Sequence, residues 1–166
     1  CANGYAIQFL LKYYEVCPQD RKEEVLAFAK ELYEWVKTNL EDSTDHCYWN
    51  SKDASGSINK TKWTYNVGVM IQNGVCLYEI TNDENYLNDI LETEKNMSVN
   101  FTYALNEASN ETLFNEIYEM FKQIKASQRN LFELSFRKGF YTLEKAETNK
   151  INEEYNTLLN KFNEIE

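Results

Sequence analysis

The strongest hydrophobic pattern in the chain begins at Trp63 and continues to Ile80. It opens with two aromatic residues and an amide, Trp63, Tyr65 and Asn66, and the residues after Gly68 are apolar on almost every side of a helix. A helix that is hydrophobic all round is typically buried. The pattern therefore predicts a buried helix whose opening residues have a role other than filling the core.

The same pattern occurs twice along the chain. A shift of about 64 residues brings similar positions together, namely Gly4 with Gly68, Ile7 with Ile71, Gln8 with Gln72, Tyr14 with Tyr78 and Glu15 with Glu79. Each copy then reaches a short polar turn and a second, amphipathic helix. We interpret this as an internal repeat of one helical hairpin, with an inner and an outer helix. Because one hairpin cannot bury its apolar faces alone, neighbouring hairpins must stack.

The first hairpin has clear boundaries in the sequence. Residues 3–16 carry apolar residues at helical spacing, and Pro18 ends this helix. Asp20, followed by Glu23, resembles a capping box for the next helix. Residues 25–40 then carry a single apolar stripe opposite a charged face, which predicts an outer helix.

Helical periodicity disappears between residues 41 and 62, where polar residues dominate and Tyr48 and Trp49 stand out as large aromatics. Long loops between packed elements are uncommon unless they are functional or disordered. The aromatic pair favours a functional loop.

The second hairpin is expected to end early. Asn82 or Asp83 would cap a shorter outer helix, and the polar stretch 94–110 is expected to be a connection or a domain boundary.

The last part of the chain has a different character. Residues 113–124 and 151–165 carry apolar residues at alternating spacings of four and three. This predicts the seam of a helical hairpin or of a short coiled coil, which fits packing in a toroid and in a separate bundle equally well. Gly139 is the expected helix break between the two segments.

Charge and hydropathy exclude two classes of partner. The chain has 27 acidic and 17 basic residues, a net charge of −10 and a pI near 4.7. Nucleic-acid phosphates repel such a chain, so no nucleic-acid partner is expected. No apolar run approaches the roughly 20 residues that span a bilayer, and no signal peptide is visible. Because the chain begins at Cys1 inside a predicted helix start, we expect a mature chain or a piece of a longer one.

The cysteines and the single histidine give little support for a metal site. Cys1, Cys17, Cys47 and Cys76 show no C-x-x-C spacing, and His46 stands near one of them. We therefore expect no metal and no cofactor. Cys76 is expected to act as a small apolar residue, and one or two disulfides among the others are compatible with the sequence.

Four Asn-x-Ser/Thr sequons stand at Asn59, Asn96, Asn100 and Asn110. Sequons of this kind suit a secreted glycoprotein, although a chain rich in asparagine also contains sequons by chance. We expect an extracellular or secretory-pathway location.

Several segments of the first half carry a family resemblance. They are Asn3-Gly4 opening a helix, Tyr14-Glu15 at its end, Leu32-Tyr33-Glu34-Trp35 on the outer helix, and Trp63-Thr64-Tyr65-Asn66-Val67-Gly68 running into Leu77-Tyr78-Glu79-Ile80-Thr81. Over residues 1–92 the chain resembles the C-terminal half of glycoside hydrolase family 76. This family comprises the endo-α-1,6-mannanases and the related fungal cell-wall mannan transglycosidases.

The resemblance implies an all-α fold of helical hairpins from an (α/α)6 toroid, present here as a partial toroid with a C-terminal helical hairpin. In this division residues 1–92 form the hairpin repeat. Residues 93–166 form a helical extension, either the diverged end of the same domain or something separate. The implied partners are a mannan-type polysaccharide or oligosaccharide and the missing remainder of the toroid.

The resemblance carries no catalytic residue into this chain. Family members are understood to use two acidic residues, usually an adjacent Asp-Asp pair, and the sequence contains no Asp-Asp. A retaining glycosidase needs two carboxyl groups roughly 5 Å apart. The adjacent pairs Glu23-Glu24 and Glu153-Glu154 lie on helical faces that we expect to be exposed. Whether the chain belongs to an enzyme therefore stays open.

What the resemblance does carry over is one wall of a cleft. Trp63, Tyr65, Asn66 and Asn3 are expected at the N-terminal ends of inner helices, and Trp49 on the loop beside them. Aromatic faces can stack on sugar rings, and amides can hydrogen-bond to hydroxyls. The alternative is that the two aromatics of the helix opening only fasten it into the core.

Three functions follow as hypotheses. The leading one is part of a secreted glycoside hydrolase acting on α-1,6-linked mannan, to which this chain supplies one wall of the glycan cleft. The second is a non-catalytic glycan-binding helical module. The third is a structural or interaction protein that uses the heptad-patterned tail, unless that tail folds back over the inner helices.

Overall fold

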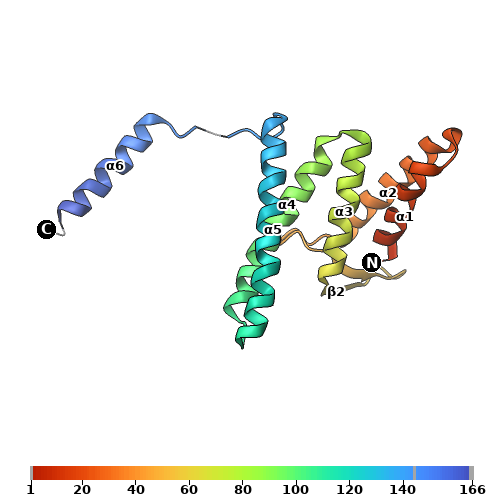
Figure 1. Ribbon diagram of the computed structural model, residues 1–166, viewed down its shortest axis with the longest axis horizontal. Helices are drawn as coiled ribbons and strands as arrows, with labels where there is room; N and C mark the ends of the chain where they lie inside the picture. The colour runs from red at the N-terminus through yellow and green to blue at the C-terminus, as the bar shows by residue number, and fades with distance from the viewer. Residues whose placement is uncertain (1, 144, 165–166) are drawn as a thin grey trace.

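The computed structural model describes residues 2–143 and 145–164 and confirms the all-α prediction. In chain order the described elements are α1 (Ala2–Val16), the short 3-10 helix η1 (Gln19–Arg21), α2 (Lys22–Leu40), β1 (Trp49–Lys52), β2 (Ile58–Lys62), α3 (Thr64–Thr81), α4 (Glu84–Asn106), α5 (Glu111–Arg137) and α6 (Thr148–Asn163). Helices α1 to α5 stand next to one another, whereas α6 stands apart (Figure 1).

The first four helices form the two stacked hairpins that the repeat predicts. Helix α1 packs against α2 and α3, and α3 packs against α4. The repeat register is visible in one contact between the inner helices, in which Gln8 Nε2 donates to Gln72 Oε1 at 2.5 Å. In a second contact between them, Asn73 Nδ2 donates to the Gly4 carbonyl at 2.8 Å. The inner helices α1 and α3 therefore lie side by side, with the equivalent residues Gln8 and Gln72 facing each other.

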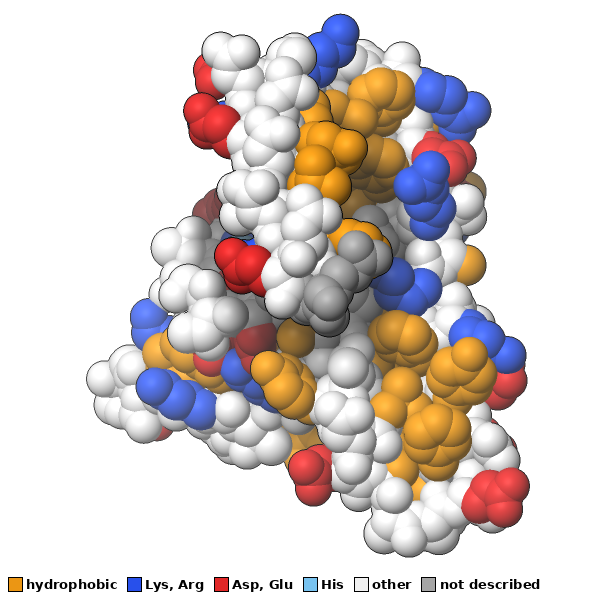
Figure 2. Space-filling view, turned by 90° about the vertical axis from the view of Figure 1, so that its left-hand side faces the viewer, with side chains coloured by type: hydrophobic (Ala, Val, Ile, Leu, Met, Phe, Trp, Pro, Cys, Tyr) orange, Lys and Arg blue, Asp and Glu red, His pale blue; other side chains and the backbone are white. Residues whose placement is uncertain are grey.

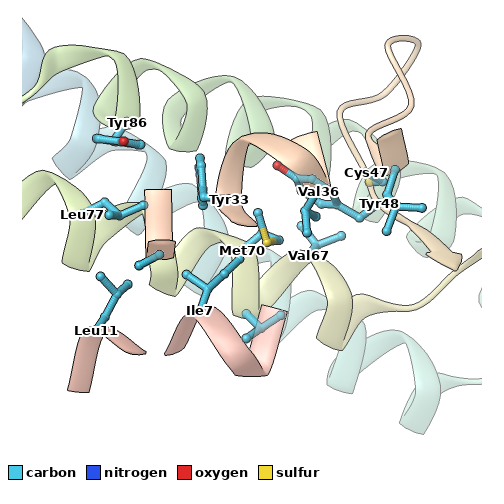
Figure 3. Close-up of a cluster of buried hydrophobic side chains, with 13 residues drawn as sticks. Ile7, Leu11, Tyr33, Val36, Cys47, Tyr48, Val67, Met70, Leu77 and Tyr86 are labelled. Carbon is cyan, nitrogen blue, oxygen red and sulfur yellow. The ribbon is translucent and has the colours of Figure 1, made fainter. Parts of the chain in front are cut away.

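The core lies between these hairpins (Figure 3). Its buried side chains come from all four helices and from the loop after α2; they include Ile7, Leu11, Tyr33, Val36, Tyr48, Met70, Leu77 and Tyr86. The rings of Tyr33 and Tyr86 meet edge to face at 5.4 Å, a favoured aromatic geometry. Burial raises the pKa of Tyr86 to about 12, so its hydroxyl stays protonated at neutral pH.

The expectation that α3 is buried all round is wrong. Gly68, Gln72 and Glu79 are exposed and follow one side of the helix. No further inner helix in the described part of the chain covers that side. On α1, Tyr5, Phe9 and Val16 are exposed in the same way. The two hairpins thus leave inner-helix surface open, as expected for part of a toroid.

Of the two expected helix caps, the one at Asp83 is present and the one at Asp20 is not. The Asp83 side chain accepts from the Asn85 backbone N–H at 3.0 Å, which confirms the cap of α4. Helix α2 instead follows η1, and its N-cap is Arg21 without a side-chain cap. The capping box expected at Asp20 is therefore wrong, because the 3-10 turn already accommodates the change of direction after Pro18.

Helix α4 is longer than expected. It continues through the polar stretch to Asn106, so the connection expected over residues 94–110 is wrong for most of its length. The expected division at residue 92 falls inside this helix. The reason is that α5 packs along α4 and buries Glu94 and Ser98. In the sequence, polar residues at such a helix–helix interface resemble the polar residues of a loop.

The C-terminal helical hairpin consists of α4 and α5, so residues 113–124 pack on α4 and not on 151–165. Helix α5 ends at Arg137, and Gly139 follows in the left-handed region with a φ of 78°, which confirms the predicted break. All described residues of α6 are exposed. The apolar seam of α6 thus covers neither α5 nor the open inner helices.

Cys17, Cys47 and Cys76 form no disulfide with one another. Cys47 is buried, and burial raises the pKa of its thiol to about 11, which keeps it protonated and unreactive. Cys76 is half-buried in α3. Cys1 lies outside the described residues, so any pairing that involves it stays a prediction. None of the described helices is apolar enough over a sufficient length to cross a membrane.

Glu94 is a buried carboxyl between α4 and α5, and it leads to a prediction about pH. Its Oε1 accepts from Ser127 Oγ at 2.7 Å, while its Oε2 has no partner among the described residues. Burial raises the pKa of Glu94, so the folded state binds the proton more tightly than the unfolded state. This contribution favours folding below the ordinary carboxyl pKa and is lost as pH rises through the folded-state pKa.

Replacing Glu94 with Gln is therefore expected to raise the free energy of unfolding at pH 8 by about 0.5–1 kcal/mol, while changing it little at pH 4. Urea denaturation at both pH values measures the difference. The control is Glu116→Gln on the exposed side of α5. Identical pH profiles for the two variants would contradict the account of Glu94.

Candidate functional site

The segment from residue 41 to residue 62 folds into a β-hairpin, which corrects the expectation of a loop without regular structure. Strands β1 and β2 pair antiparallel, with Lys52 opposite Ile58 and Trp49 opposite Lys62. Glu41 and Tyr48 form an additional bridge at the base. The hairpin packs on the C-terminal part of α2 and leads directly into α3. Its aromatic residues therefore lie beside the N-terminal ends of the inner helices.

Asp42 fixes the base of this hairpin. Its carboxylate accepts from the Thr44 N–H at 3.0 Å, from Trp49 Nε1 at 3.2 Å and from Lys62 Nζ at 2.6 Å. Lys62 also reaches Asp45 Oδ2 at 2.8 Å. The hydrogen bond from Lys62, and next those from Thr44, hold the pKa of Asp42 well below its usual range. Asp42 is therefore ionised at neutral pH and is used to hold Trp49 and β2 in place.

A second ionic cluster connects the loop to α4. His46 adopts a left-handed backbone with a φ of 53°, and its Nδ1 lies 2.6 Å from Glu41 Oε1. Nearby, Lys37 Nζ lies 2.5 Å from Asp89 Oδ2. These four side chains line a polar cavity of about 190 Å³. Because each has an oppositely charged or hydrogen-bonding partner, the cluster is explained by its role in joining α2, the loop and α4.

A cavity lies where α1 begins, α2 ends and the hairpin folds over both. Its volume is about 260 Å³, and we call it the hairpin pocket. Its walls are Ala2, Asn3 and Gly4 from α1, Trp35, Val36 and Leu40 from α2, and Tyr48, Trp49, Asn50, Ser51 and Lys52 from the hairpin. Two of the five residues that the resemblance assigned to glycan binding, Asn3 and Trp49, therefore share one cavity.

The chemistry of the hairpin pocket suits a neutral, polyhydroxylated ligand. Trp35 and Trp49 supply indole faces, and Asn3 and Asn50 supply amides that can donate to and accept from hydroxyls. Lys60 Nζ lies 5.1 Å from the centre of the Trp49 ring. None of the described residues that line the pocket is an aspartate, glutamate, histidine or cysteine. The side chains of the pocket thus suit a sugar, and none of the described residues that line it supplies a carboxyl group for the acid or nucleophile of a glycosidase.

The other three assigned residues lie elsewhere. Trp63 lines a separate cavity of about 200 Å³, the Trp63 pocket, together with Lys62, Thr64 and Val67 and with Met97, Asn100 and Phe101 of α4. Tyr65 stacks on Trp63 with ring centres 6.3 Å apart, and both rings are about half exposed. Asn66 is completely buried, and neither atom of its amide has a hydrogen-bond partner among the described residues. The structure therefore brings Trp63 and Tyr65 together but separates them from the hairpin pocket.

Sequence reasoning missed Trp35 as a wall of the pocket. A usable signal was present, because Trp35 lies off the apolar stripe of α2, which runs through Val36 and Leu40, and a tryptophan on the charged face of an outer helix needs an explanation. No comparable feature of the sequence indicated that Lys62 holds Asp42 and Asp45 in place. Among the described residues, no group of three or more acidic, cysteine or histidine side chains is arranged to hold a metal ion.

Solved structures with the same arrangement of helices are family 76 glycoside hydrolases. A GH76 α-mannanase of Bacteroides thetaiotaomicron is 30% identical with a TM-score of 0.55, over 74% of this chain and 35% of that one. The GH76A α-1,6-mannanase of Salegentibacter sp. is 26% identical with a TM-score of 0.53, over 76% of this chain and 46% of that one. The chain thus has a GH76-like toroid fold but spans only 21–46% of the lengths of the solved hydrolases it matches.

A family model and a curated relative also match parts of the chain. Residues 82–144 match the family model described as the Coat F domain. The uncharacterized protein YusN of Bacillus subtilis is 35% identical over 74 residues, which make up 45% of this chain and 67% of YusN. At that identity over two thirds of the relative, the chain belongs to the protein family of YusN.

Proposed function

We propose that the first two hairpins bind an α-1,6-linked mannan-type oligosaccharide in the hairpin pocket without hydrolysing it. The observation that carries the proposal is the pocket itself, in which Trp35, Trp49 and the amides of Asn3 and Asn50 converge and none of the described lining residues carries a carboxyl side chain. A sugar ring on an indole face, with amide hydrogen bonds to its hydroxyls, makes full use of these groups.

The comparisons support the class of ligand. The Salegentibacter mannanase was solved in complex with α-1,6-mannotriose as an inactive variant in which two adjacent aspartates are replaced. The present chain contains no adjacent pair of aspartates. On this proposal the chain is either a non-catalytic glycan-binding module or one wall of a hydrolase whose remaining helices and catalytic carboxylates lie outside it. Its sequons, including Asn59 on the exposed hairpin, suit an extracellular or secretory-pathway location.

The test is isothermal titration with α-1,6-mannotriose, with the same sample checked for product. We expect saturable binding and no product. Replacing Trp35 with Ala is expected to weaken binding about tenfold, because the indole supplies one face of the sugar site, and Trp49→Ala should act in the same direction. Trp49 also donates a hydrogen bond to Asp42, so Trp49→Ala can change the folding of the hairpin as well as ligand contact. Trp35→Ala removes a ligand contact without removing that hydrogen bond.

Trp63→Ala is the matched control, because Trp63 lines the other cavity. An effect of Trp63→Ala without an effect of Trp35→Ala would place the sugar in the Trp63 pocket and contradict the proposal. Release of mannose or mannobiose would refute the non-catalytic part.

A structural or interaction role of the tail is the second candidate. It is favoured by α6, whose described residues are all exposed, and by the match of residues 82–144 to the Coat F domain.

A further inference from the structure

Helix α6 carries an apolar stripe that no other described part of the chain covers. The stripe consists of Ile151, Tyr155, Leu158, Leu159 and Phe162, whose exposed fractions run from 42% to 63%. These positions follow one side of the helix, and the charged and amide residues follow the other. Isolated helices shorter than about 12–15 residues are marginal in water, and one only slightly longer gains most of its stability from packing. We therefore expect the stripe of α6 to pack against a partner surface.

The same chain carries a second uncovered apolar surface, at the end of the α4–α5 hairpin. We call it the hairpin-end patch; its members are Val99 and Tyr103 of α4 and Phe114 and Tyr118 of α5, with exposed fractions of 42–66%. Phe114 and Tyr118 stack at 6.0 Å. In Figure 2, which views the molecule from the side of α6, hydrophobic side chains gather in more than one area of the surface. An amphipathic helix and an apolar helical surface are complementary, and the described residues leave both uncovered.

The described residues directly after α5 are fixed at the end of this helix that lies away from the hairpin-end patch. After Gly139, the backbone N–H groups of Phe140 and Tyr141 both donate to the Ser135 carbonyl, at 2.9 and 3.3 Å. The Tyr141 ring then meets Phe132 edge to face at 5.1 Å. These contacts anchor the chain at the end of α5 opposite to the patch, and α6 extends outward from there (Figure 1).

The two surfaces are large enough for a stable dimer. A large aromatic side chain buries roughly 150–250 Å² when fully covered, so half-exposed members give each surface on the order of 500 Å². Two reciprocal contacts would then bury on the order of 2,000 Å², against the 1,200–2,000 Å² of typical specific interfaces. We propose that the chain forms a dimer by exchanging α6, with the stripe of each copy lying on the hairpin-end patch of the other. This gives the interaction role a named partner, a second copy, and is independent of glycan binding.

The first experiment is sedimentation equilibrium of the full chain without glycan. The wild type is expected to show the mass of two 19.6 kDa chains at micromolar concentration. The double variant Leu158→Glu, Phe162→Glu should raise the dissociation constant of the dimer at least about tenfold. The double variant Asn156→Glu, Asn160→Glu adds the same charges to the opposite side of α6 and should leave the dimer intact. A monomeric wild type, or equal loss of dimer in both variants, would overturn the proposal.

A mixing experiment separates exchange from folding back within one chain. The patch variant Tyr118→Glu and the stripe variant are each expected to be monomeric, because each lacks one of the two complementary surfaces. Mixed together, they retain one intact stripe and one intact patch on different chains, so a heterodimer should form. If α6 instead covers the patch of its own chain, the mixture stays monomeric and the proposal is wrong. Neither result changes the expected binding of mannotriose by the first two hairpins.

Discussion

Replacing Leu77 with Ala is expected to lower the free energy of unfolding by about 3 kcal/mol. The side chain of Leu77 has no exposed surface and lies in the cluster where α1, α2, α3 and α4 meet (Figure 3). The substitution removes buried atoms and leaves a cavity, because the other members of the cluster are held on different helices and cannot all move to fill it. Urea denaturation followed by circular dichroism measures the change.

The matched control is Leu143→Ala in the connection between α5 and α6, where the leucine is exposed. It is expected to change the free energy of unfolding by less than about 0.5 kcal/mol. Similar effects of the two variants would mean that the hairpins are not held together by this cluster.

The stacking of the hairpins could be predicted from the sequence because the repeat encodes contacts directly. Gln8 and Gln72 occupy the same position in the two copies, and they are hydrogen-bonded to each other in the structure. Residues at the same height on two neighbouring parallel helices must face each other. A repeat register therefore predicts side-by-side packing, even though it says nothing about which outer surfaces stay open.

The hairpin over the pocket could not be predicted in the same way. It is held by Asp42, Lys62 and Asp45, and the first two of these are twenty residues apart. Ion pairs across such a distance leave no periodic trace in the sequence. For the same reason the resemblance predicted Asn3 and Trp49 as binding residues but did not show that they share a cavity with Trp35, whereas Trp63 lies in another.

The position of α6 shows a further limit of predicting helix packing from the sequence. The spacing of its apolar residues predicted the amphipathic helix, but a stripe specifies only that some apolar surface is needed. Residues 113–124 carry a similar stripe, and the sequence suggested that the two segments pair. In the structure α5 packs on α4, because α4 extends to Asn106 and lies next to α5 after a short turn. Helix α5 therefore packs on α4, the helix that directly precedes it in the chain, and not on α6.

The two glycines of α3 are expected to respond to alanine with opposite signs. A Cβ on Gly74 would lie 2.9 Å from Ile90 Cγ1 and 3.0 Å from Tyr33 Oη. A Cβ on Gly68 would meet nothing within 4 Å. In a helix interior, alanine normally stabilises by roughly 0.5–1 kcal/mol relative to glycine. Gly68→Ala should gain this amount, whereas Gly74→Ala should lose about 1–2 kcal/mol, because overpacking there outweighs the gain.

The reason for the difference lies in how three helices cross. Tyr33 comes from α2 and Ile90 from α4, and both approach the backbone of α3 at Gly74. The Tyr33 ring is fully buried against Tyr86, so it cannot swing away, and Cγ1 of Ile90 is close to its own helix backbone. Urea denaturation of both variants measures the two signs. A stabilising Gly74→Ala would show that α2 and α4 can separate at no cost, and the close crossing would then not be what fixes the two hairpins against each other.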